Sequence, residues 1–192
     1  MKKINSKGFT LIELLAVITI MGILMMVAIP AVSRTIENSR RDAFANIAHE
    51  YINSVRNALL ADNIACELND STVIASATPE GTYYFPIDTA TDTSGTKDLM
   101  ESGGRSSFGN AEMYGYVKWV KKSEVVDVGE GQDVKTKMEY SIVLYDSGSH
   151  GFTEELKEAD VKRAKISTSL ATVKKEAGAP PAAEKATKCT MS

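Results

Sequence analysis

The stretch Lys7-Gly8-Phe9-Thr10-Leu11-Ile12-Glu13-Leu14-Leu15 determines how this chain is organised. A short basic leader ends at Gly8, and the chain from Phe9 to Val32 is then almost wholly apolar, with no charge between Leu14 and Ser33. Twenty helical residues extend about 30 Å, which is the thickness of the hydrocarbon core of a bilayer. The stretch therefore predicts a membrane-spanning helix directly after a basic leader.

One carboxylate, Glu13, lies inside the start of this apolar run. A charged residue near the centre of a membrane segment costs about 2.5–3.5 kcal/mol on insertion scales, so its presence requires a partner. An ordinary secretory signal peptide, cut near Ala28 to Ala31, would leave Glu13 unexplained, and its apolar run would be shorter, about 7–15 residues. A plain membrane anchor is a further alternative.

The junction Lys7-Gly8 followed by Phe9-Thr10-Leu11-Ile12-Glu13 resembles the class III leader of type IV pilins and their pseudopilin relatives. The resemblance covers about the first fifty residues closely and the rest only in layout. It implies cleavage between Gly8 and Phe9 by a prepilin peptidase, which also N-methylates the new amino group of Phe9. It further implies that a pilus assembly platform extracts the subunit from membrane lipid into a helical homopolymer.

In this family, the carboxylate at the position of Glu13 meets the N-terminal amine of a neighbouring subunit. Cleavage after Gly8 would create a positive amine four residues before Glu13, among apolar helices. Each charge alone is unfavourable there, whereas a pair formed between neighbours satisfies both and sets their axial register. The resemblance thus assigns Glu13 to subunit assembly, together with the segment between Gly22 and Pro30, where such helices can loosen.

Length and charge set further bounds. The chain has 192 residues, which indicates one domain beyond the membrane segment. Loss of Lys2, Lys3 and Lys7 with the leader takes the formal charge from −3 to −6, which argues against a specific nucleic-acid partner. Basic residues before the apolar run place the bulk of the chain outside the cytoplasm. We expect a single-pass protein of the cytoplasmic membrane before assembly and an extracellular fibre afterwards.

The second half of the helix has an amphipathic pattern. We predict one helix from about Phe9 to about Ala61, roughly 80 Å long, with Gly22 and a kink-forming Pro30 inside it. Beyond Pro30, apolar residues recur at three- and four-residue steps, which indicates a stripe that packs on a globular head. The stripe consists of Val32, Ile36, Ala43, Phe44, Ile47, Tyr51, Val55, Ala58 and Leu59.

The sequence from Asp62 to Met113 predicts mainly loops, with turns at 69–71, 78–81 and 102–104, a short strand 82–85 before Pro86, and an exposed loop 89–96. A β-hairpin follows, with strands near 114–121 and 138–144 around a turn at 129–131. On the second strand Met138, Tyr140, Ile142 and Leu144 should cover the helix, while Lys137, Glu139, Ser141 and Val143 face water. Trp119 is expected to be packed.

The C-terminal part carries weaker signals. Residues 154–165 predict a short helix, although 161–166 also alternate like a strand, and 174–192 predict a flexible tail. Cys66 and Cys189 are compatible with one disulfide outside the cytoplasm. In the chain-entropy model, closing this loop would stabilise the folded state by about 4–5 kcal/mol. Because Cys189 lies in the predicted tail, the pairing remains open.

Together these patterns predict an α+β, pilin-like fold in which a long helix packs on an antiparallel sheet. The expected parts are a leader (1–8), a membrane half (9–33), an amphipathic half (34–61), a head (62–173) and a tail (174–192). His49 and His150 lack neighbours at metal-ligand spacing, so we expect surface histidines, no metal and no cofactor.

No catalytic constellation is visible, and an enzyme or solute-binding protein would need a pocket that the sequence does not show. The function indicated is a pilus subunit for adhesion, surface motility or aggregation; the alternative is a pseudopilin of a type II secretion or DNA-uptake system.

Overall fold

The computed structural model describes residues 9–68, 71–90, 100, 104–127, 132–168 and 187–191. The chain divides into two compact units, Met1–Ser39 and Arg40–Ser192. Helix α1 (Leu11–Leu60) supplies the described helix of the first unit, and its second half belongs to the unit that contains the sheet. The second unit is called the head below.

Helix α1 begins two residues after the predicted start and ends one residue before the predicted end. It continues through Gly22 and Pro30 without a break. The helix stays continuous because only two of its residues disfavour a helix, Gly22 and Pro30, and they are eight positions apart. The prediction of one long helix is therefore confirmed. Loosening between Gly22 and Pro30 during assembly stays a prediction.

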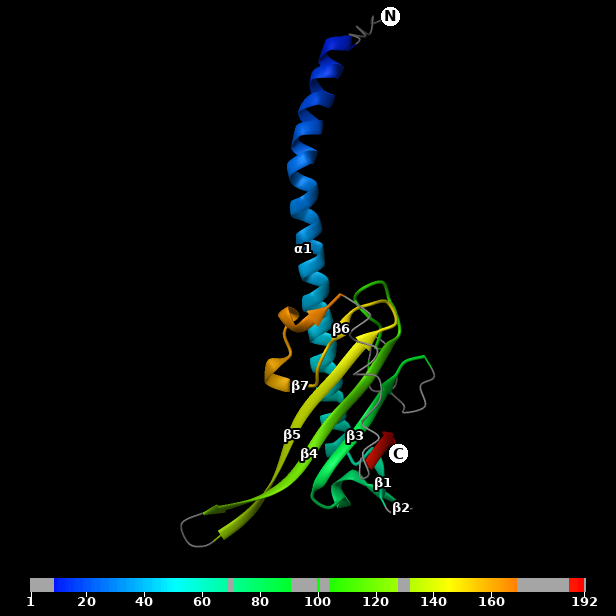
Figure 1. The fold of residues 1–192 in the computed structure, drawn as a ribbon, viewed down its shortest axis with the longest axis vertical. Helices are drawn as coiled ribbons and strands as arrows, with labels where there is room; N and C mark the ends of the chain where they lie inside the picture. The colour runs from blue at the N-terminus through cyan, green and yellow to red at the C-terminus, as the bar shows by residue number, and fades with distance from the viewer. Residues whose placement is uncertain are drawn as a thin grey trace, which may run out of the picture. The chain divides into compact units, whose positions relative to one another are not determined.

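The head contains a mixed sheet of nine described strands in the order β2-β1-β9-β3-β4-β5-β6-β8, with β7 also paired to β5 (Figure 1). Every pair is antiparallel except β3 with β9, which is parallel. The predicted α+β class is confirmed. The elements are β1 (Ile64–Leu68), β2 (Ser71–Ile74), η1 (Ala75–Ala77), β3 (Gly81–Asp88), β4 (Met113–Asp127), β5 (Gln132–Asp146), β6 (Gly151–Phe152), β7 (Leu156–Lys157), η2 (Glu158–Asp160), η3 (Arg163–Lys165), β8 (Ile166–Ser167) and β9 (Thr187–Met191).

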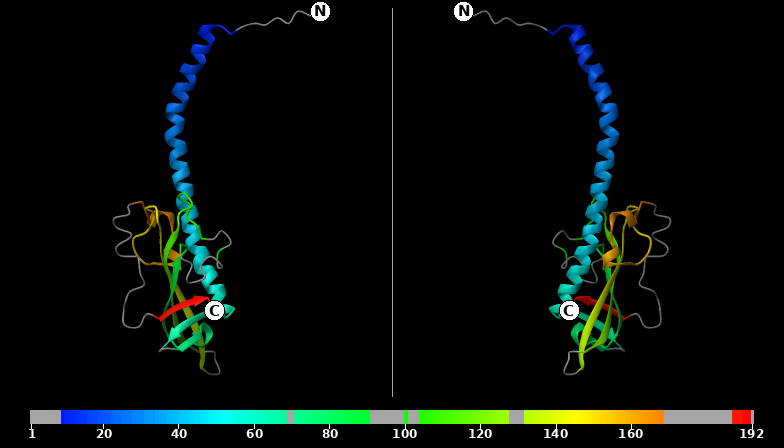
Figure 2. Two further views of the ribbon diagram at one scale, coloured as in Figure 1. Left: turned by 90° about the vertical axis from the view of Figure 1, so that its right-hand side faces the viewer. Right: turned by 90° about the vertical axis from the view of Figure 1, so that its left-hand side faces the viewer.

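Strands β4 and β5 form the predicted hairpin, in a continuous antiparallel register from Met113↔Asp146 to Asp127↔Gln132. Its expected turn at 129–131 lies outside the described residues. Figure 2 shows the second half of α1 running along one face of the sheet. Ile142 and Leu144 are fully buried there, Met138 and Tyr140 pack against the same core, and Trp119 is buried as expected.

The prediction that Val143 faces water is wrong. Val143 is buried on the other face of the sheet, directly opposite Tyr116 in the register. Tyr84 meets Tyr116 edge-on with ring centroids 5.3 Å apart, and Tyr145 completes this second apolar cluster. Cross-strand aromatic neighbours cover the valine, an effect that alternation along one strand cannot reveal.

The packed stripe of α1 is shorter than predicted. Val32 and Ile36 remain exposed, and Ala43 and Ile47 are only half-buried. The helix joins the core at Phe44, where the head first covers it. Its buried residues are Phe44, Ala45, Ala48, Tyr51, Ile52, Val55, Ala58 and Leu59.

The region after the helix holds more strand than the predicted loops. Strands β1 and β2 pair directly after α1, from Ala65↔Ile74 to Leu68↔Ser71. Strand β3 runs through Pro86 instead of ending before it. Among the described residues β9 pairs with β3 at Tyr83 and Tyr84 and not at Pro86, and a proline without an amide hydrogen is tolerated at such an edge. Thr89 is fully buried, and the Met113 amide donates to its Oγ1 at 2.8 Å.

The two C-terminal predictions also need correction. Residues 154–165 form β7 and the 3₁₀ turns η2 and η3 rather than an α-helix, because Leu156 pairs with Ile142 of β5. Within the predicted flexible tail, β9 lies between β1 and β3. Cys66 and Cys189 are register partners and form a disulfide. Sheet pairing over a sequence separation of 123 residues decides both features.

Candidate functional site

The candidate assembly site begins at Phe9, which is 89% exposed. One residue, Thr10, lies between Phe9 and the start of α1 at Leu11. The proposed cleavage partner Gly8 lies outside the described residues, so cleavage between the two remains a proposal. The exposed Phe9 is the residue whose amino group would become the new N-terminus.

Thr10 and Glu13 form a reciprocal cap on the first turn of α1. The Thr10 amide donates to Glu13 Oε2 at 2.9 Å, and the Thr10 hydroxyl donates to the same oxygen at 2.7 Å. In return, the Glu13 amide donates to Thr10 Oγ1 at 3.3 Å. This arrangement is a capping box, which satisfies amides that the helix itself leaves without acceptors.

The sequence analysis missed this cap, although the pattern Thr-x-x-Glu at the start of an apolar helix is its known signal. Glu13 therefore makes contacts within its own chain, in addition to the contact with a neighbouring subunit that the resemblance implies. The cap does not depend on the leader, because Thr10 keeps its amide hydrogen if the chain is cut after Gly8. Among the described residues, Glu13 Oε1 has no hydrogen-bond partner, so one oxygen remains available to a second group.

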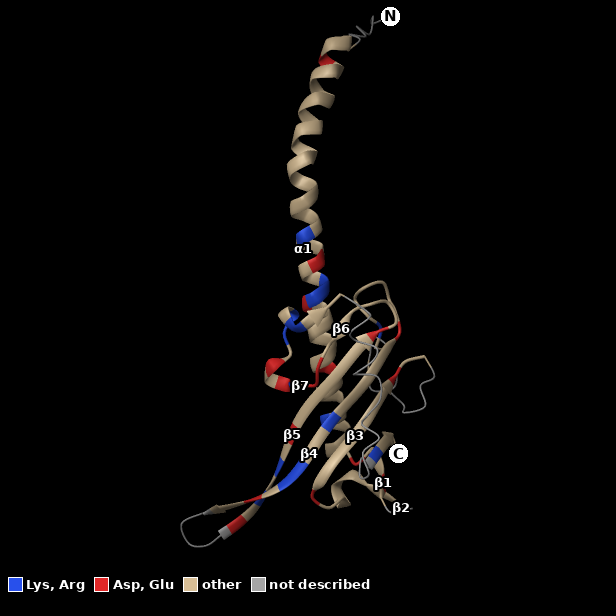
Figure 3. Ribbon diagram, viewed as in Figure 1, with Lys and Arg blue, Asp and Glu red and all other residues tan. Residues whose placement is uncertain are grey.

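Between Glu13 and Arg34 the first half of α1 presents an uncharged surface, tan throughout in Figure 3. Its large apolar side chains are all exposed, and an 18-residue window within α1 has a mean hydropathy of 2.6. The helix is long and apolar enough to cross a membrane. Apolar surface on this scale needs lipid or protein to cover it.

Two threonine hydroxyls of α1 donate to the backbone of the helix itself. Thr19, in the first half, donates to the Ala16 carbonyl at 2.8 Å, and Thr35, just beyond it, donates to the Ala31 carbonyl at 3.1 Å. Pro30 has no amide hydrogen to donate. A side chain at Gly22 would meet nothing within 4 Å, so the glycine there is not required by packing within the chain.

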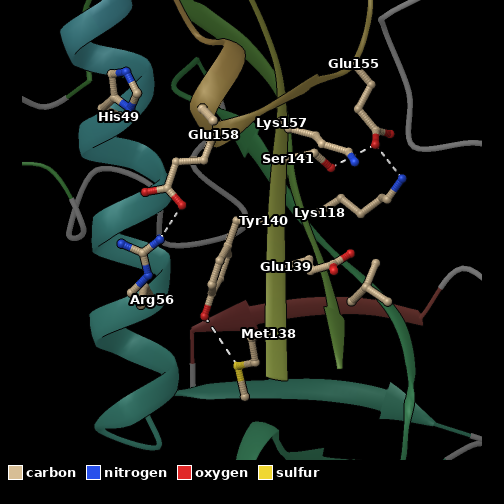
Figure 4. A pocket seen from close by; sticks show the side chains of 12 residues that line it. His49, Arg56, Lys118, Met138, Glu139, Tyr140, Ser141, Glu155, Lys157 and Glu158 are labelled. Carbon is tan, nitrogen blue, oxygen red and sulfur yellow. Dashed lines mark hydrogen bonds and ion pairs between the residues drawn. The ribbon is translucent and has the colours of Figure 1, made fainter. Parts of the chain in front are cut away.

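A groove of about 770 Å³ in the head lies between α1, β4, β5 and the turn after β7 (Figure 4). Its charges are largely paired with one another. Arg56 Nη2 donates to Glu158 Oε2 at 2.5 Å and its guanidinium lies 4.6 Å from the Tyr140 ring centroid, while Lys118 and Ser141 both donate to Glu155. The contacts of Arg56 connect α1 to β5 and to the turn after β7. Because most of the charges neutralise one another, the groove does not indicate a particular ligand or reaction.

Asp146 is the most buried carboxylate of the described head. Burial raises its pKa, but hydrogen bonds from the His150 amide, the Ser106 hydroxyl and the Ser149 amide outweigh this effect and hold the pKa below its ordinary value. The His150 ring stacks on Phe108 with centroids 3.8 Å apart, so this histidine is not a simple surface residue.

Ser106, Asp146 and His150 do not form a catalytic triad. In a triad the serine hydroxyl donates to the histidine, whereas Ser106 donates to the Asp146 carboxylate. The other histidine, His49, lies with Nε2 3.2 Å from the Val161 carbonyl. In the described part of the chain, no group of three or more His, Cys, Asp or Glu side chains could hold a metal ion.

Residues 3–29 match the family model of the prokaryotic N-terminal methylation motif. The match covers the leader junction, the Glu13 cap and the apolar half of α1. The long helix and the sheet of the head agree with this match. The chain fits a type IV pilin-like protein. Comparisons with curated proteins and with solved structures gave no match.

For a type IV pilin-like protein, the motif indicates a structural precursor whose leader a prepilin peptidase processes. The apolar helix at its start is consistent with membrane anchoring before assembly into pilus-like filaments. The matched residues stop at 29, before the head, and they are shared by pilins and pseudopilins.

Proposed function

We propose that this chain is the structural subunit of a type IV pilus, a fibre used for adhesion, surface motility or aggregation. A prepilin peptidase cuts between Gly8 and Phe9 and methylates the amine of Phe9, and an assembly platform then adds the subunit to the fibre. The observation that carries the proposal is the exposed, charge-free first half of α1 directly behind a methylation motif. That surface is suited first to lipid and then to other copies of the same helix.

Glu13 has two roles in this proposal. Through Oε2 it caps its own helix, which orders the first turn before assembly. Through Oε1 it accepts the methylated amine of Phe9 from a neighbouring subunit. A cation and a carboxylate that are both removed from water stabilise each other only as a pair, so the contact favours one axial register between copies.

Three variants separate these roles. Glu13→Val removes both the cap and the charge, whereas Glu13→Gln keeps a capping acceptor and removes only the charge. Thr10→Val removes the two hydrogen bonds of the Thr10 hydroxyl, leaves the backbone amide that donates to Glu13, and keeps the charge. We expect all three chains to enter the membrane and to be cleaved, because the junction at Gly8 is intact and loss of a charge favours lipid.

Sheared filaments should fall at least tenfold for Glu13→Val and Glu13→Gln, but less than threefold for Thr10→Val. Membrane fraction, intact mass and filament yield are measured separately for each variant. Wild-type filament yield from Glu13→Gln would show that the charge is not needed. Loss of insertion or cleavage would contradict the proposed order of events.

The alternative, a pseudopilin of a type II secretion or DNA-uptake system, shares the same leader motif. It would form a short piston instead of a surface fibre. Electron microscopy of cells with and without this chain, expressed at its native level, distinguishes the two. Long surface filaments that disappear with the chain support the pilus, and unchanged surface filaments with impaired secretion or uptake support the pseudopilin.

A further inference from the structure

Basic residues from two distant parts of the sequence come together in the head. Arg40 and Arg41 belong to α1, while Lys162, Arg163 and Lys165 belong to the segment around η3. The two parts are in contact: Arg41 Nη1 donates to the Ile166 carbonyl at 3.5 Å, and Arg163 Nη1 lies 3.2 Å from Asp42 Oδ2. These five residues are called the basic collar.

The collar lies close to the apolar segment along the chain. Ser33 ends the charge-free run, and Arg40 follows seven residues later in the same unbroken helix. At the helical rise this separation is about 10 Å, comparable to the Debye length at physiological ionic strength. When the first half of α1 spans a bilayer, Arg40 is therefore held near the headgroups of the outer leaflet.

The collar side chains are available to a surface. Arg40, Lys162, Arg163 and Lys165 are exposed. Two ion pairs of the collar, Arg163 with Asp42 and Lys165 with Glu154, have both partners about half exposed or more. Exposed pairs of this kind contribute little and exchange readily, so phosphate oxygens can replace the carboxylates.

The position of these cations runs against two trends in the molecule. Basic residues that flank membrane helices are usually concentrated on the cytoplasmic side, whereas the collar follows the apolar segment on the opposite side from the leader. The remaining chain is acidic overall, with a formal charge of −6 once Lys2, Lys3 and Lys7 are removed. Neither orientation in the membrane nor general solubility accounts for a cluster of cations at this place.

We propose that the basic collar binds the phosphate-bearing headgroups of anionic phospholipids while the subunit waits in the membrane. This inference rests on the membrane-held stage of the proposed function. Arginine binds phosphate through two parallel hydrogen bonds and lysine binds it as a point charge. Each basic residue near an anionic surface increases partitioning about fivefold, and the effect falls off within a Debye length. Lipid contact thus holds the head at the outer leaflet until the subunit is extracted.

The test uses the full mature chain in lipid nanodiscs, which expose both membrane faces. One set contains only phosphatidylcholine, and the other contains about a third phosphatidylglycerol. Lysine acetylation rates are followed by mass spectrometry at Lys162 and Lys165. Lys122 and Lys137, which are register partners on the β4–β5 hairpin, serve as controls in the same molecule.

We expect acetylation of Lys162 and Lys165 to be at least threefold slower in the anionic discs, and this protection to disappear at high salt. The double variant Arg40→Gln/Arg163→Gln should lose most of the protection, while Lys122 and Lys137 should react equally in both lipids. Equal rates for the collar lysines in both lipids would overturn the proposal, as would protection that extends to the hairpin controls.

A third arm adds inorganic phosphate to phosphatidylcholine discs. Protection by free phosphate alone would identify a small-anion site and overturn the assignment to lipid. None of these measurements depends on polymerisation. A chain that failed to form filaments would contradict the proposed function and leave the collar result intact, whereas a chain that forms filaments without lipid-dependent protection would contradict only the collar.

Discussion

Both halves of α1 are rich in apolar side chains, but only the second half finds cover within its own chain. In the head, Phe44 to Leu59 supply eight buried residues to the core. In the first half, from Leu11 to Val32, the large apolar side chains are all exposed. One continuous helix thus combines a segment stabilised by tertiary packing with one whose environment must come from outside the chain.

The difference follows from how the polar residues are arranged. In the second half they interrupt the apolar ones at helical spacing, so that a single stripe is left to pack on a sheet. In the first half no charged residue lies between Leu14 and Ser33, and Thr19 is the one polar side chain between these two residues, so the helix is apolar on nearly every side. A helix of that kind suits a bilayer or the interior of a bundle.

The largest expected effect tests whether the first half functions as part of a processed subunit. In Gly8→Val, a β-branched side chain occupies the last residue of the leader, and we expect the peptidase to leave the chain uncut. Intact mass should then show a membrane-held precursor, with no filaments in the sheared fraction. Ser6→Val, a matched change two residues earlier, should be processed normally. Filaments at wild-type yield from Gly8→Val would contradict the cleavage assignment.

A second prediction places the same charge in the two environments. Ile142→Asp buries an unpaired carboxylate against the second half of α1, so the free energy of unfolding of the head should fall by about 3–5 kcal/mol. Ile36→Asp lies on the exposed part of α1 and should change it by less than about 0.5 kcal/mol. Near-UV circular dichroism of Trp119 in detergent follows the unfolding. Equal losses would show that Ile36 is packed.

A third prediction concerns the disulfide that fixes β9 to the strand directly after α1. Replacing Cys66 and Cys189 together by alanine should lower the free energy of unfolding by about 2–5 kcal/mol. Reduction of the wild-type chain should produce a similar loss and leave the double variant unchanged. If the midpoint of the wild type did not move on reduction, the disulfide would not stabilise the head.

The smallest effect is expected at Asp146. It accepts a hydrogen bond from Ser106, and Ser106 binds the amide of Phe108, which packs against Phe44 at the start of the packed half. Because the folded state holds the pKa of Asp146 below 3.8, this carboxylate adds stability above that pH, and the contribution is lost as pH falls through the folded value. Asp146→Asn should cost about 1–3 kcal/mol at pH 7. The difference from wild type should shrink as the pH falls below 3.8; a constant difference would contradict the shift.

Several features could be predicted because their causes are local. The membrane half, the long helix and the β4–β5 hairpin follow from runs, periods and β-branched residues that lie next to one another in the chain. The capping box was equally local, and Thr10 with Glu13 carried its signal. Glu13 carries two signals at once, as a charge in an apolar segment and as a residue in the first turn of a helix, and the first one conceals the second.

Other features required partners that are far apart in sequence. Strand β9 and the Cys66–Cys189 bond depend on where β1 and β3 leave space for a strand, and the polar composition before Thr187 gives no sign of it. Val143 is buried only because tyrosines on β3, β4 and β5 surround it. Likewise, Leu156 pairs with Ile142, which overrides the helical spacing of the segment that contains it.

The sequence alone therefore determined the leader junction, the uncovered apolar half of α1 and the α+β class, because each depends on residues within one or two helical turns or one strand. The tertiary structure decided where α1 begins to be buried, which strands flank the C-terminal strand, and that Arg41 and Asp42 meet the basic segment around η3. Those outcomes depend on contacts between residues that lie up to about 120 positions apart in the sequence. Local patterns cannot predict such contacts, because the contacts form only when the whole chain folds.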